Sequence, residues 1–190
     1  GTRMITDHCS KNECQCFGGL ALNRSVGLFN VYAVDAACNM GARTIYMPTV
    51  SCVNHIAGHS GGHKFVGSGQ LHPGAVDVIS YIATKHPEVV LCTGHGTARE
   101  VDAVVRKAVE LGVPKICVNH PHFLVNATYE QMREWADLGA YIELNAAVFS
   151  SIAKSGTCSD EMAGKILEII PTEKIVLDSD LGQKVNVDPI

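Results

Sequence analysis

One βαβ segment, residues 89–122, constrains the fold more than any other part of the sequence. Val89–Thr93 and Lys115–Asn119 are apolar, β-branched runs of strand length. The residues between them place apolar side chains at the spacing of one helix face, at Val101, Val104, Val105, Ala108 and Leu111. His95 and His120 follow the two strands directly. We therefore expect the two histidines close together at the carboxyl ends of parallel strands, where α/β folds gather their chemistry.

The same alternation of strand and helix continues through the chain. Further strands are predicted at Arg3–Cys9, Phe17–Leu22, Thr44–Val50, Ala140–Asn145 and Lys174–Asp178. Helices are predicted at Asn30–Gly41, Gly74–His86, Thr128–Leu138 and Ser159–Ile170. Residues 51–74 are rich in glycine and histidine without a sustained period, which predicts a long loop. The pattern predicts a parallel sheet with right-handed crossovers.

Composition narrows the class of protein. A chain of 190 residues with 46% hydrophobic residues can bury one core, so a single domain over residues 1–190 is expected. The net charge of −4 gives no basic field for nucleic acid. No apolar run approaches the roughly 20 residues that span a bilayer, and the chain does not open with a signal pattern, which favours a cytoplasmic protein. Cys38, Cys92 and Cys117 lie in predicted buried elements and are expected to be reduced, structural thiols.

Most predicted strands end in a polar side chain. These residues are His8, Asn23, Thr49, His95, His120, Glu143 and Asp178. If the strands close into a barrel, the imidazoles and carboxylates meet at one mouth and provide ligands suited to zinc, manganese or iron. Such an ion acidifies a bound water to a hydroxide nucleophile while a free Asp or His transfers protons.

Other polar residues near these ends have open roles. Glu143 is a ligand, a proton carrier or a helix cap, and His122 is either a group behind the ligands or a loop residue. Asp178 and Asp180 share one face if the last strand continues that far. Four histidines lie in the glycine-rich segment, at His55, His59, His63 and His72. They favour a solvated lid, with one of them reaching the site as the alternative.

Several sequence blocks together resemble a poorly characterised family of amidohydrolase-like, metal-dependent TIM barrels. The blocks are GGLALNRSVG, IYMPTVSCVNH, VVLCTGH, VNHPH, GAYIELN and LDSDLGQ, and they extend over about residues 17–183. The resemblance implies a (β/α)8 barrel with a divalent metal at the strand ends. It matches His95 and His120 to the histidines of the fifth and sixth strands, and Asp180 or Asp178 to the acid of the last strand. The Asp-x-His or His-x-His pair on the first strand of related barrels is absent here.

The resemblance makes Arg3–Cys9 the second strand of the barrel. A (β/α)8 barrel typically has about 250 residues, so we expect the first strand, with further ligands, to be missing from this sequence.

The leading hypothesis is a metal-dependent hydrolase that acts on a small molecule. Its candidate ligands are His95, His120, Asp180, Asp178 and His8, with zinc favoured and manganese or iron as alternatives. Its candidate catalytic residues are Asp180, Glu143 and His122. A metal-assisted lyase or decarboxylase on the same barrel is one alternative. A non-catalytic barrel that binds a metabolite or supports a homo-oligomer is another.

Overall fold

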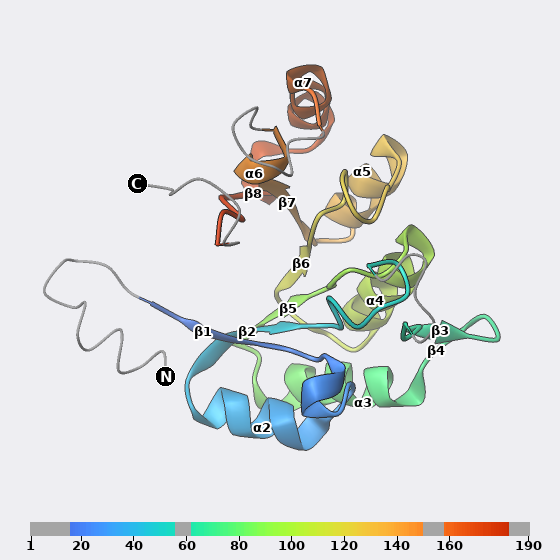
Figure 1. Ribbon diagram of the computed structural model, residues 1–190, viewed down its shortest axis with the longest axis vertical. Coiled ribbons are helices and arrows are strands. Elements are labelled where there is room, and N and C mark those ends of the chain that lie inside the picture. Colours follow the sequence, from blue (N-terminus) through green and yellow to red (C-terminus); the bar gives the residue numbers. More distant parts are fainter. Residues whose placement is uncertain (1–15, 56–61, 150–157, 183–190) are drawn as a thin grey trace, which may run out of the picture.

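A parallel β-sheet forms the centre of the computed structural model, which describes residues 16–55, 62–149 and 158–182 (Figure 1). The sheet has six strands in the order β1-β2-β5-β6-β7-β8, and each neighbouring pair is parallel. The strands are β1 (Gly18–Ala21), β2 (Ala42–Tyr46), β5 (Val90–Cys92), β6 (Ile116–Val118), β7 (Tyr141–Asn145) and β8 (Ile175–Asp178). The six predicted strands that lie in the described residues are confirmed, whereas Arg3–Cys9 and His8 lie outside those residues.

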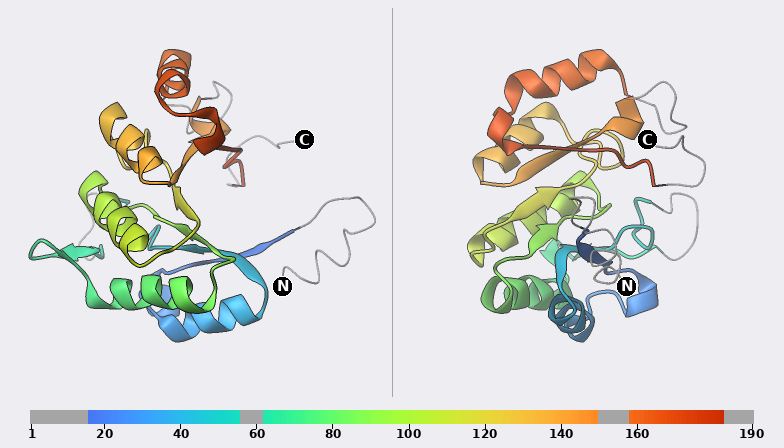
Figure 2. Two further views of the ribbon diagram at one scale, coloured as in Figure 1. Left: turned by 180° about the vertical axis from the view of Figure 1, so that it is seen from behind. Right: turned by 90° about the vertical axis from the view of Figure 1, so that its left-hand side faces the viewer.

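Helices cover the convex side of the curved sheet (Figures 1 and 2). The α-helices are α2 (Val31–Asn39), α3 (Pro73–Lys85), α4 (Ala98–Glu110), α5 (Tyr129–Asp137), α6 (Ala146–Phe149) and α7 (Asp160–Ile169). Two 3-10 turns, η2 (Arg24–Val26) and η3 (Thr172–Lys174), complete the described helical elements. Thr97 and Thr128 begin α4 and α5 with capping boxes that satisfy the first backbone N–H groups. None of the described helices has the length and apolarity needed to cross a membrane.

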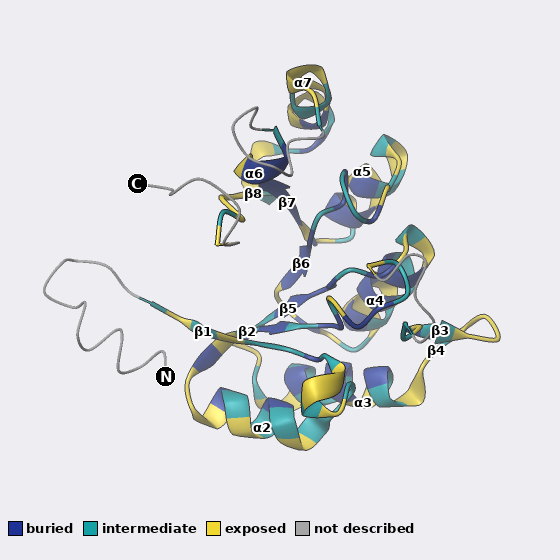
Figure 3. Cartoon of the chain, in the orientation of Figure 1, coloured by how far each residue is buried: buried dark blue, intermediate teal, exposed yellow. Residues whose placement is uncertain are grey.

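The core lies between the sheet and these helices. Val101, Val104 and Val105 of α4 are fully buried, as the helix spacing predicted, and Figure 3 shows the buried helix faces turned toward the strands. Alternation along each strand sends Leu91 of β5 to the same side, where it is also fully buried. The result is an α/β fold whose helices all cross over on one side of the described sheet.

The opposite, concave face of the sheet lines a cavity of about 410 Å³. The lining residues alternate along five strands: Thr44, Tyr46, Val90, Cys92, Lys115, Cys117, Tyr141, Glu143, Val176 and Asp178. Cys92 and Cys117 are register partners, and both are free thiols, as is Cys38. The prediction of reduced cysteines at these positions is confirmed.

The sheet does not close within the described residues. There β1 and β8 form the two edges and are not paired with each other. The structure therefore establishes a six-stranded parallel α/β sheet, which is the coarser part of the predicted fold.

The expectation of one long loop at residues 51–74 is wrong in part. An antiparallel pair, β3 (Val66–Gly67) and β4 (Gln70–Leu71), lies within it. The fully buried Phe65 donates its backbone N–H to Oε1 of the buried Glu100 at 2.7 Å. This long-range contact anchors the segment to α4, and no local sequence period could reveal it.

Candidate functional site

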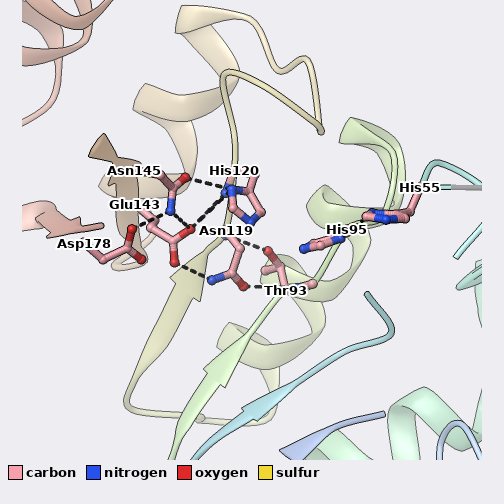
Figure 4. A network of polar contacts seen from close by, with 9 residues as sticks. His55, Thr93, His95, Asn119, His120, Glu143, Asn145 and Asp178 are labelled. Atoms are coloured by element: carbon pink, nitrogen blue, oxygen red, sulfur yellow. Dashed lines mark hydrogen bonds and ion pairs between the residues drawn. The ribbon is translucent and has the colours of Figure 1, made fainter. Parts of the chain in front are cut away.

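His95 and His120 lie side by side at the carboxyl ends of β5 and β6, as the sequence predicted (Figure 4). Their ring centroids are 4.9 Å apart and the rings meet edge to face. Gly94 precedes His95 with φ of +68°, and a Cβ there would lie 2.5 Å from the carbonyl oxygen of Met47. The close approach therefore requires glycine at the turn that directs His95 into the site.

Asn145, on β7, fixes the tautomer of His120. Its side-chain nitrogen donates to Oε1 of Glu143 at 2.9 Å and to Oδ1 of Asp178 at 2.6 Å. Its oxygen lies 2.7 Å from Nδ1 of His120 and must act as the acceptor, because the amide nitrogen is already directed at two carboxyl groups. Nδ1 of His120 consequently carries a proton, and a neutral His120 presents its Nε2 lone pair.

Glu143 joins the ends of three strands. Its side chain is buried, and it accepts from Nδ2 of Asn119 at 2.7 Å and from the backbone N–H of His120 at 3.3 Å. Asn119 in turn accepts from the backbone N–H of Gly94 at 3.2 Å and donates its own backbone N–H to Oγ1 of Thr93 at 3.2 Å. This network, drawn in Figure 4, ties β5, β6 and β7 together behind the two histidines.

The surroundings of the site lower the pKa of His95 and raise those of Asp178 and Asp180. Burial, followed by the nearby rings of His120 and His55, lowers the pKa of His95 to about 3. Partial burial, followed by the charge of Glu143, raises the pKa of Asp178 to about 6. Burial also raises the pKa of Asp180, although His120 acts in the opposite direction. Asp178 therefore keeps its proton to a higher pH than a free aspartic acid does.

The structure separates the two candidate acids of the last strand. β8 ends at Asp178, which lines the concave cavity, so the strand does not continue to Asp180. Asp180 has a φ of +45° and lies close enough to His120 for that ring to affect its pKa. Both carboxyl groups thus lie near the site: Asp178 through its contact with Asn145, and Asp180 through its proximity to His120.

His122 is buried and its ring stacks on Phe149, with centroids 4.7 Å apart. Neither ring nitrogen has a hydrogen-bond partner among the residues that the structure describes. Burial, and then the His120 ring, lower the pKa of His122 to about 4. His122 is therefore a buried imidazole near His120 whose lowered pKa favours the neutral form.

His55 joins the site from the glycine-rich segment, for which the sequence favoured a solvated lid, with one histidine reaching the site as the alternative. Its Nδ1 lies 2.9 Å from Nδ1 of His95, and the two rings stack with centroids 5.0 Å apart. His63 and His72 instead pack around Phe29, with centroids 5.2 and 5.1 Å from that ring. His59 lies outside the described residues. The only signal for His55 in the sequence was its place after a strand that ends at the same edge of the sheet.

Within the described residues, no group of three or more His, Cys, Asp or Glu side chains is already arranged to hold one metal ion. The imidazoles of His95 and His120 are adjacent, and Asn145 fixes the tautomer of His120.

Comparison with known proteins gives one family. Residues 1–143 match the family of unknown function DUF6282. This match covers most of the chain. The protein belongs to the DUF6282 family. The matched part of this DUF6282 protein includes His55, His95, His120 and Glu143, whereas Asp178 lies beyond it. No curated protein matches the sequence.

Proposed function

We propose that the protein is a metal-dependent hydrolase of the amidohydrolase type that acts on a small molecule. One observation carries the proposal: His95 and His120 meet at the carboxyl edge of a parallel sheet, directly beside the carboxyl pair of Glu143 and Asp178. Side chains in such a position can bind a cation and transfer protons to a bound substrate. The concave cavity of about 410 Å³ shares Glu143 and Asp178 with this group of side chains.

The donor chemistry fits a divalent ion. His120 keeps its Nε2 lone pair because Asn145 holds its Nδ1 proton, and burial keeps His95 neutral. These two imidazoles would hold zinc, or alternatively manganese or iron, together with the carboxylate of Asp180 or Asp178. Bound there, the ion would supply an acidified water.

The residues of the chain have separate roles in this proposal. Asp178 is the candidate proton carrier, since partial burial and then the charge of Glu143 raise its pKa to about 6. Asn145 orients His120 and keeps the two carboxyl groups in place. Asp180 is the candidate for the base or ligand nearest His120. His122 supports the loop that carries His120 and lies next to Phe149.

We also propose that the six strands belong to a (β/α)8 barrel. Three features support this: the strands are all parallel, the helices lie on the convex side of a curved sheet, and the polar side chains gather at the carboxyl ends. An orderly succession of neighbouring strands, β5 to β8, is the arrangement that successive βα units of a barrel produce.

The proposed function is tested by a hydrolysis screen with the full chain. The protein is loaded with Zn²⁺, Mn²⁺ or Fe²⁺ and assayed against esters, lactones, amides and phosphoesters of small molecules. We expect activity with at least one class, loss of it after chelation, and at least a 100-fold loss on His120→Ala. His86→Ala is the matched control, because His86 follows α3 at the opposite end of β5. Activity that survives both chelation and His120→Ala would contradict the proposal.

A further inference from the structure

Residues 52–55 form hydrogen bonds with both loops that carry the site histidines. The thiol of Cys52 donates to the carbonyl oxygen of His95. Nδ2 of Asn54 donates to the carbonyl oxygens of Gly96 at 3.1 Å and Leu124 at 2.8 Å. Gly96 belongs to the loop after β5, and Leu124 to the loop after β6. The segment therefore fixes the two loops relative to each other through Cys52 and Asn54, independently of the His55 side chain.

His55 completes this arrangement on the ring of His95. The 2.9 Å contact joins the Nδ1 atoms of both rings, so one of these nitrogens carries the proton and the other accepts it. A neutral His95 has a single ring proton, and the contact places either that proton or the Nδ1 lone pair of His95 against His55. The position of that one proton decides whether Nε2 of His95 faces the site as a lone pair or as an N–H group.

The chemistry of imidazole favours His55 as the acceptor. A neutral, exposed histidine prefers the tautomer with its proton on Nε2, which leaves Nδ1 free to accept, and His55 is the exposed member of the pair. His95 then donates from Nδ1 and keeps a lone pair on Nε2. His120 is held in the same way, since its Nδ1 donates to Asn145. Two different partners thus leave the two neighbouring rings with the same tautomer.

We propose that His55 is a positioning residue that holds His95 in the Nδ1–H tautomer, so that His95 and His120 present matched Nε2 lone pairs to one ligand. In metal sites a histidine ligand usually donates its second ring nitrogen to a carboxylate, a carbonyl or water. Here an imidazole from residues 52–55 takes that place beside His95. The use of these lone pairs for catalysis rests on the proposed function, whereas the tautomer of His95 does not.

The tautomer is read directly by ¹⁵N NMR of the histidine side chains in the metal-free full chain at pH 7.5. We expect the pyrrole-type shift at Nδ1 and the pyridine-type shift at Nε2 for His95. His55→Ala is expected to move His95 toward the opposite tautomer. His55→Gln, which supplies an amide oxygen as acceptor, restores the original pattern at least in part. His86→Ala changes neither ring nitrogen of His95.

A second measurement follows Zn²⁺ binding to the same variants by competition with a chromophoric chelator. Loss of an outer partner of a ligating histidine typically weakens metal affinity by about 10- to 100-fold, and we expect this for His55→Ala, with recovery in His55→Gln. A wild-type His95 protonated on Nε2, or a tautomer that His55→Ala leaves unchanged, overturns the inference. Failure of the wild-type chain to bind Zn²⁺ would count against the proposed function alone, because the NMR result remains readable.

Discussion

Replacement of Asn145 by alanine is expected to destabilise the fold by about 3 kcal/mol. Asn145 is 1% exposed and connects His120, Glu143 and Asp178 through three hydrogen bonds. A hydrogen bond to a charged group contributes about 1.5–3 kcal/mol and a neutral one about 0.5–1.5 kcal/mol. The simple sum exceeds 3 kcal/mol, but Glu143 and Asp178 border the concave cavity, so water can replace part of what is lost.

The assay is reversible urea unfolding of the metal-free chain, with thermal unfolding alongside. For a chain of 190 residues, 3 kcal/mol corresponds to a fall in melting temperature of about 6–12 °C. Asn39→Ala is the control, because Asn39 is exposed and its side chain donates to the nearby Asp35 in the same helix, so a change within about 0.5 kcal/mol is expected. A loss below about 1 kcal/mol for Asn145→Ala would refute the view that this amide holds the site together.

Three further predictions concern neighbouring residues. Gly94→Ala should lower the free energy of unfolding by about 1–3 kcal/mol more than the control Gly112→Ala. Both glycines have positive φ, but of the two only Gly94 would place a Cβ against backbone atoms. Equal losses of unfolding free energy in urea would contradict this. His122→Phe should stabilise the fold by about 1–3 kcal/mol at pH 7, because it replaces two unpaired buried nitrogens next to Phe149. Its advantage should grow as pH falls from 6.5 toward 4, where the unfolded state of the parent gains a proton that the folded state accepts only at a pKa of about 4; a shrinking advantage would be inconsistent with a buried neutral imidazole. Asp178→Asn should gain stability over the parent as pH rises from 3.8 to about 6, because the raised pKa makes ionisation of Asp178 costly in the folded state, and should then level off; a difference independent of pH, measured with chelator present, would contradict the raised pKa.

The sheet could be predicted from sequence because its signals are local. Val89–Thr93 and Lys115–Asn119 contain the strands β5 and β6, and the histidines after them meet as parallel pairing requires. The contact of His55 with His95 could not be predicted, since it depends on a segment without any period that reaches back over the sheet edge. The choice between the two acids of the last strand depended on where β8 ends, and strand ends are the least regular part of a pattern.

The central claim is that His95 and His120 bind a divalent cation together. Its most direct test is the Zn²⁺ stoichiometry and affinity of the full chain, compared with His95→Ala and His120→Ala, with circular dichroism to verify folding. We predict saturable Zn²⁺ binding in the parent chain and its loss in either variant with the fold retained, since both residues lie beyond the strand ends rather than in the packed core. Unchanged Zn²⁺ binding in both folded variants would contradict the account.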